Sequence, residues 1–221
     1  MTQTASSVLQ STLSQKIIPL ASIGNFEALK STVKALYDGG SKIFELTLRN
    51  NDVVALMADY IKFSRQVYPD MAAGLGSISD SELAQQAVKL KPDFIVGPGY
   101  SDSIRQICQN AGVLYVPGCQ TTTEITTLIE HKIPLGKLFP GAMLGISNTK
   151  ALLAPFARYR SQTKIMITGG VNVDTKGSSI AEWLEVVDAV GVGSIIGELA
   201  EQGKFEQIQR NMHEALSRVP N

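Results

Sequence analysis

The chain has 221 residues, of which 44% are hydrophobic and 18% are charged, so it can bury a sizeable core and its composition excludes a disordered chain. Twenty basic residues balance twenty acidic ones, so no net charge steers the molecule onto nucleic acid or an anionic membrane. No apolar stretch approaches the ~18 residues that a membrane-spanning helix needs, and the N-terminus lacks the pattern of a secretory signal. We expect a cytoplasmic protein with no nucleic-acid or membrane partner.

Short apolar runs alternate with longer segments of helical period along the chain. The runs predict strands at Ile17–Ala21, Ile43–Leu48, Met71–Gly74, Phe94–Val96, Leu114–Pro117, Lys137–Phe139, Lys164–Thr168 and Ala189–Val192. The other segments predict helices at Ser6–Ser14, Asn25–Tyr37, Val53–Val67, Ser79–Leu90, Ser101–Asn110, Thr122–His131, Asn148–Arg158, Ser179–Val187 and Phe205–Arg218. No linker or low-complexity segment interrupts this alternation, so residues 1–221 are expected to form a single domain.

Strands that alternate with helices are typical of parallel βαβ units. Eight such units predict an α/β protein with a closed (β/α)8 TIM barrel, to which Ser6–Ser14 adds an extra N-terminal helix. A doubly wound open sheet is the alternative architecture. It needs a Gly-rich nucleotide-binding turn after the first strand, and Ala21-Ser22-Ile23-Gly24 does not have that pattern.

The second predicted strand carries polar side chains on one face. Side chains alternate along a strand, so Glu45, Thr47 and Arg49 share the face opposite Phe44 and Leu46. Both faces of a parallel sheet are covered, and buried polar groups are costly without partners or a ligand. Glu45 is therefore a candidate general acid/base. Arg49, at the end of the strand, is a candidate clamp for a substrate carboxylate, because a guanidinium binds a carboxylate through two hydrogen bonds.

The sixth predicted strand contains a lone lysine, Lys137, among the apolar residues Leu135, Leu138 and Phe139. Surface lysines are usually solvated, but a lysine in a strand of a parallel sheet loses water. Desolvation lowers the pKa of a lysine, and a nearby Arg49 cation would lower it further. A neutral amine can attack a ketone and form an iminium, which makes cleavage of a neighbouring C–C bond accessible. Lys137 is therefore a candidate nucleophile.

Gly-rich turns follow the last two predicted strands, at Thr168-Gly169-Gly170 and at Gly193-Ser194, where Ile195–Leu199 opens a short predicted helix. TIM barrels hold phosphate at these two turns with backbone N–H groups, although glycines also simply close tight loops. After the third strand, Ser77 can donate a hydrogen bond to a ligand. After the fourth, Pro98 can line the mouth of the barrel.

The sequence does not favour a metal or a cofactor. His131 and His213 are the only histidines and lie far apart, which argues against a histidine-rich zinc site and against a Ser-His-Asp triad. Cys108 and Cys119 lack the spacing of metal ligands and fall in apolar surroundings, which is typical of buried free thiols.

In order and spacing, the candidate residues resemble the family of 2-keto-3-deoxy-6-phosphogluconate (KDPG) aldolase and 4-hydroxy-2-oxoglutarate (KHG) aldolase. The resemblance extends from about Leu13 to Ala215. It rests on Glu45–Arg49, Gly74–Ser77, Pro98-Gly99, Pro117-Gly118, Lys137–Pro140, Thr168–Gly170 and Gly193-Ser194. No single segment identifies the family, but the order and spacing of the segments together are specific to it.

The resemblance implies a (β/α)8 barrel, usually a homotrimer, with Schiff-base chemistry and no metal. By position, Lys137 matches the Schiff-base lysine, Glu45 the acid/base that shuttles protons, and Arg49 the residue that binds the pyruvate carboxylate. Phe139 matches an aromatic residue beside the lysine, and Ser77 stands where the family usually has Thr. The residues around the distal phosphate match Thr168, Gly169, Gly170, Gly193 and Ser194.

The implied reaction is cleavage of a small-molecule 2-keto-4-hydroxy acid. KDPG, which is phosphorylated, gives pyruvate and glyceraldehyde 3-phosphate, as in the Entner–Doudoroff pathway; 4-hydroxy-2-oxoglutarate gives pyruvate and glyoxylate. The alternatives are an aldolase for KDPGal, the C4 epimer of KDPG, a non-aldolase phosphosugar isomerase or decarboxylase, and a binding protein on the same barrel.

Two departures from the family pattern bear on these expectations. Leu138 replaces a common Phe and is expected to face outward. After Pro140 the family often has Ala-Glu, where this chain has Gly141-Ala142. We expect a loop at Gly141–Leu144 that lies near the substrate and affects its choice.

Overall fold

The computed structural model describes residues 3–171 and 180–219. The strands are β1 (Ile17–Ala21), β2 (Ile43–Thr47), β3 (Ala72–Gly76), β4 (Phe94–Val96), β5 (Leu114–Val116), β6 (Gly118–Cys119), β7 (Leu135–Leu138), β8 (Lys164–Ile167) and β9 (Ala189–Val192). The helices are α1 (Ala5–Gln15), α2 (Phe26–Asp38), α3 (Asn51–Ala55), α4 (Met57–Val67), α5 (Ser81–Lys89), α6 (Asp102–Ala111), α7 (Thr122–Glu130), α8 (Gly141–Leu153), the 3-10 helix η1 (Ala154–Tyr159), α9 (Ile180–Leu184), α10 (Ser194–Glu201) and α11 (Phe205–Ser217). None of the helices in these ranges is long and apolar enough to cross a membrane.

The strands form a parallel barrel, which confirms the predicted fold class. Hydrogen-bonded neighbours follow the order β5-β4-β3-β2-β1-β9-β8-β7-β6. The two end strands of this order, β5 and β6, are separated in sequence only by Pro117, which has no N–H to donate to a ladder. β5 pairs with β4 and β6 pairs with β7, so the two segments act as halves of one strand. The fifth barrel strand therefore continues past the predicted end at Pro117 as β6, and the nine segments correspond to eight barrel strands.

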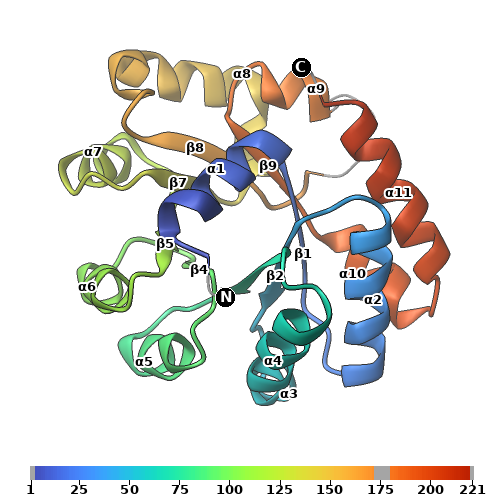
Figure 1. Cartoon of the computed structure of the whole chain (residues 1–221). Helices are drawn as coiled ribbons and strands as arrows, with labels where there is room; N and C mark the ends of the chain where they lie inside the picture. Colours follow the sequence, from blue (N-terminus) through green and yellow to red (C-terminus); the bar gives the residue numbers. More distant parts are fainter. Residues whose placement is uncertain (1–2, 172–179, 220–221) are drawn as a thin grey trace.

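Alternation along the strands sorts side chains between the barrel interior and the helices. On β2, Phe44 and Leu46 pack outward in the large apolar layer under the helices, whereas Ile43 belongs to a separate apolar cluster inside the barrel. Leu138 also lies in the outer layer, as expected from the sequence. Figure 1 shows the helices as an outer ring around the strands.

Helix α1 closes the amino-terminal end of the barrel (Figure 1). Val8 is completely buried and packs with residues at the beginnings of strands, among them Ile18, Ile43 and Leu114. The helix starts at Thr4, whose hydroxyl accepts a hydrogen bond from the N–H of Ser7. This end of the barrel is therefore apolar and filled, and the carboxyl ends of the strands remain for a site.

Two helical predictions and one loop prediction need correction. The segment Val53–Val67 is divided at Leu56 into α3 and α4. The helix predicted at Asn148–Arg158 begins already at Gly141 and continues after Leu153 as the 3-10 helix η1. Gly145, with φ of 65°, breaks the regular period inside α8, which hides the helix from a periodicity argument. The Gly141–Leu144 segment, expected as a loop, is thus helical.

Other boundaries of the predicted strands and helices also differ. Strand β7 begins at Leu135, two residues before the predicted start, because the pairing with β8 extends to the register Leu135–Lys164. The helix predicted at Ser179–Val187 is seen as α9, and its first predicted residue lies outside the described residues.

Candidate active site

A cavity of about 740 Å³ opens at the carboxyl ends of the strands. All twelve residues singled out in the sequence line it: Glu45, Thr47, Arg49, Ser77, Pro98, Lys137, Phe139, Thr168, Gly169, Gly170, Gly193 and Ser194. They come from six barrel strands or from the turns that follow them, so only the closed barrel brings them together.

Glu45 lies inside the barrel and is only 3% exposed. The hydroxyl of Thr47 donates a hydrogen bond to its Oε1 at 3.3 Å. Gly76 on the neighbouring strand makes room for the carboxyl group, because a Cβ at that position would fall 1.8 Å from Oε1. Burial raises the pKa of Glu45, and the nearby Lys137, Thr47 and Arg49 partly oppose that rise.

Lys137 projects into the same cavity from β7 and is 6% exposed. Its backbone N–H donates to the carbonyl of Pro117 at 2.9 Å, and its Nζ lies 4.9 Å from the centre of the Phe139 ring. Burial lowers the pKa of Lys137, the Glu45 carboxylate opposes this, and the Arg49 cation lowers the pKa further. A lysine in this environment loses its proton more readily than a solvated one, which favours the nucleophilic amine.

Ser77 occupies a constrained turn directly after β3. Its φ is 62°, in the left-handed region that non-glycine residues seldom adopt and that β-branched residues adopt least. The backbone at this position therefore suits Ser better than the Thr expected from the family pattern. Its side chain lines the cavity between Thr47 on β2 and Pro98 after β4.

The two Gly-rich turns lie next to each other, because β8 pairs with β9. Gly169 and Gly170 have φ of 91° and 79°, conformations that glycine adopts without strain. The N–H groups of Gly141 and Ala142 donate to the carbonyls of Thr168 and Gly169 at 2.7 and 2.8 Å. The start of α8 therefore supports the Thr168–Gly170 turn from behind and is not itself among the residues that line the cavity.

The turn that contains Pro98 is held by Tyr115 and by Gly118. The Tyr115 hydroxyl donates to the carbonyl of Gly99 at 3.1 Å and accepts from the N–H of Ser101 at 3.2 Å. A Cβ on Gly118 would fall 1.9 Å from the carbonyl oxygen of Pro98, so this strand and turn can approach only at a glycine. Gly118 pairs with Lys137 in register, which places the Pro98 turn beside the lysine strand.

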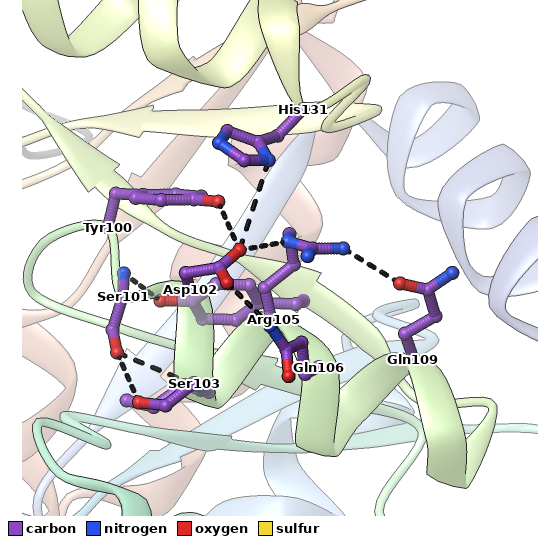
Figure 2. A network of polar contacts seen from close by, with 10 residues as sticks. Tyr100, Ser101, Asp102, Ser103, Arg105, Gln106, Gln109 and His131 are labelled. Atoms are coloured by element: carbon purple, nitrogen blue, oxygen red, sulfur yellow. Dashed lines mark hydrogen bonds and ion pairs between the residues drawn. The ribbon is translucent and has the colours of Figure 1, made fainter.

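Behind this turn, a polar network fixes the start of α6. Figure 2 shows the carboxylate of Asp102 at its centre, with Tyr100, Arg105, Gln106 and His131 around it. The Arg105 guanidinium, 2.7 Å from Asp102, holds the pKa of that carboxyl below its usual range. The network lies outside the cavity lining.

Several cavity residues were missed in the sequence. Ser22 directly follows β1 and Asn50 lies three residues after the end of β2, so their positions after predicted strands could have suggested them. The Ser22 hydroxyl is buried and has no hydrogen-bond partner within the described ranges. The others are Leu20, Ala21, Val171, Gly197, Glu198 and Glu201.

Neither the cysteines nor the histidines are among the residues that line the cavity. Cys108 and Cys119 are buried free thiols, and burial raises the pKa of each to about 12. Over residues 3–171 and 180–219, no group of three or more His, Cys, Asp or Glu residues is placed to hold a metal ion.

Comparison with known proteins identifies relatives over nearly the whole chain. The 2-dehydro-3-deoxy-phosphogluconate aldolase of Treponema pallidum is 27% identical and aligns with 92% of this chain and 93% of its own length. The protein of the same description from Haemophilus influenzae is 26% identical, with 98% of both chains aligned.

Solved structures share the fold. A KDPG aldolase from Legionella pneumophila, crystallised with pyruvate captured as a covalent carbinolamine intermediate, superposes with a TM-score of 0.80 at 23% identity over 94% of this chain and 97% of that one. A native KDPGal structure superposes with a TM-score of 0.74 at 24% identity over 91% and 93% of the two chains. The model of the KDPG and KHG aldolase family matches residues 8–211, and the chain therefore belongs to that family.

Proposed function

We propose that the chain cleaves 2-keto-4-hydroxy acids by class I aldolase chemistry, with Lys137 as the Schiff-base residue. The observation that carries this proposal is the buried Lys137 amine in one cavity with the buried Glu45 carboxyl group and the Arg49 guanidinium. Membership of the family makes the chain a metal-independent carbon–carbon lyase and argues against the isomerase, decarboxylase and binding-protein alternatives.

In the proposed first stage, Arg49 and Ser77 bind the 1-carboxylate of the substrate and orient its C2 carbonyl towards Lys137. The neutral amine attacks C2 and forms a carbinolamine, and loss of water gives an iminium. Glu45 donates the proton that turns the departing hydroxyl into water. Its raised pKa suits this role, because it keeps a larger fraction of the group protonated near neutral pH than a solvated glutamate has.

In the second stage, Glu45 acts as a base. It takes the proton of the C4 hydroxyl as the C3–C4 bond breaks, and the electron pair of that bond flows into the iminium. An aldehyde leaves and an enamine of pyruvate remains on Lys137. Glu45 returns the proton to C3, and water then hydrolyses the iminium to release pyruvate and the free amine.

The proposed substrates are KDPG and 4-hydroxy-2-oxoglutarate, with KDPGal as the alternative because both KDPG and KDPGal enzymes superpose on this chain. Backbone N–H groups at Thr168–Gly170 and Gly193-Ser194 would bind the phosphate of KDPG, as at other helix N-termini. Coupled detection of pyruvate from the three compounds tests this proposal. If the protein releases pyruvate from none of the three compounds, the proposal is refuted.

We also propose a homotrimer in the cytoplasm. The support for the trimer is the family resemblance; a designed protein cage made by fusing symmetric oligomeric domains contains a similar fold, with a TM-score of 0.75 over 91% of this chain and 71% of that one. Light scattering after size exclusion should give three times the mass of one chain. A monomer mass would rule the trimer out.

A further inference from the structure

One face of α10 forms the distal wall of the cavity. Ser194, Gly197, Glu198 and Glu201 all line it, and their spacing of three, four and seven residues places them on one side of a helix. A Cβ on Gly197 would meet nothing within 4 Å, so open space lies against this face. Both glutamates are exposed, and neither side chain has an ion-pair or hydrogen-bond partner within the described part of the chain.

The charges along the cavity are unevenly placed. Its cationic lining residues in the described ranges are Lys137 and Arg49, which belong to the end where the keto acid would react. Among the described residues, the only charged groups that the distal wall contributes are the carboxylates of Glu198 and Glu201. The amino end of α10 favours an anion through its N–H groups. Glu198 and Glu201 lie about 6 and about 10 Å further along the helix from Ser194, because each residue adds ~1.5 Å.

We propose that Glu198 and Glu201 are specificity-determining residues that weaken binding of a phosphate dianion at the distal end. They shift the preference of the enzyme towards 2-keto-4-hydroxy acids that are short or whose tail ends in uncharged hydroxyl groups. Carboxylates accept hydrogen bonds from such hydroxyls. The inference rests on the proposed aldolase function and deepens it.

Coulomb repulsion sets the size of the effect. Over a separation on the order of 6 to 10 Å, in a mostly aqueous dielectric and at low salt, each carboxylate should weaken binding of a dianion roughly two- to fivefold. A tail without net charge should be nearly insensitive to the same two groups.

The test compares three substrates that differ only in the tail: KDPG, its unphosphorylated counterpart 2-keto-3-deoxygluconate, and 4-hydroxy-2-oxoglutarate. kcat and KM are measured for the wild type and for the Glu198→Gln/Glu201→Gln double variant at ~20 mM and ~500 mM salt. Glu130→Gln is the matched control, because Glu130 is an exposed glutamate on α7 outside the cavity lining.

We expect the double variant to lower KM for KDPG roughly four- to twentyfold at low salt, with kcat and the other two substrates changed less than about twofold. The gain should shrink at high salt, which a purely structural effect of the substitutions would not do. Glu130→Gln should behave as the wild type.

An unchanged KM for KDPG, an equal change for all three substrates, or a gain that persists at high salt would overturn the inference. These results leave the aldolase function standing as long as the wild type releases pyruvate. A wild type that releases pyruvate from none of the three substrates would instead refute the proposed function and, with it, this inference.

Discussion

Lys137 and Glu45 are two ionisable side chains that the barrel removes almost completely from water. Burial lowers the pKa of the lysine and raises that of the glutamate, so each is shifted towards its neutral form. The charge of each group stabilises the charged form of the other and limits these shifts. A proton can therefore move between the pair and a bound substrate at modest cost, which is what carbinolamine formation and dehydration require.

Replacing Lys137 should change stability and activity in opposite directions. A lysine whose folded-state pKa is lowered holds its proton more weakly in the folded chain than in the unfolded one. It therefore destabilises the fold fully below that lowered pKa, and the penalty falls as the pH rises from there and is gone above the ordinary pKa of 10.5. Lys137→Met should therefore abolish turnover and raise the free energy of unfolding by about 1 to 3 kcal/mol at neutral pH. Urea denaturation at pH ~7 and ~10 measures this difference. A variant less stable than the wild type at neutral pH would contradict it.

Gly76 matters because of the side chain that faces it. In Gly76→Ala the new methyl group would fall 1.8 Å from Glu45 Oε1, so the carboxyl group must move. A displacement near 1 Å costs about a hundredfold in rate when a catalytic group is misplaced. We expect kcat to fall by roughly that factor. Gly99→Ala, where a Cβ meets nothing within 4 Å, is the control, and equal losses in both variants would argue against this role.

At the scale of elements, the turn after β4 depends on one hydroxyl. Tyr115→Phe leaves the carbonyl of Gly99 and the N–H of Ser101 without their partner. We expect a loss of about 1 to 2 kcal/mol in unfolding free energy and a several-fold lower kcat/KM, because Pro98 in that turn lines the cavity. Thermal unfolding and pyruvate release measure the two effects. Tyr100→Phe removes only the hydroxyl that donates to Asp102 (Figure 2) and should change neither appreciably.

The same scale shows what the sequence could predict. Strands were found because apolar runs such as Phe94–Val96 are short and bounded, and the site residues because they follow those runs. The full extent of α8 was missed because Gly145 interrupts its period, and the break at Pro117 becomes visible only when the pairing partners of β5 and β6 are known. Glu198 and Glu201 on α10 were missed because their spacing alone does not reveal that this helix face borders a cavity.

At the scale of the whole molecule, the two ends of the barrel differ in polarity and in role. The amino-terminal end is sealed by α1 over an apolar layer, and the carboxyl-terminal end holds the polar cavity. Val8→Asp would bury an unpaired charge at the sealed end, since Val8 is 0% exposed. It should cost at least about 3 kcal/mol in unfolding free energy. A variant as stable as the wild type in urea would show that α1 does not close the barrel in solution.

The central claim is that Lys137 forms the covalent link to the keto acid. Borohydride reduction in the presence of pyruvate, followed by digestion and mass mapping of the peptides, tests it most directly. A reduced pyruvyl adduct should appear on the peptide that contains Lys137, and it should be absent from Lys137→Met. No adduct in the wild type, or an adduct on another lysine, would contradict the claim.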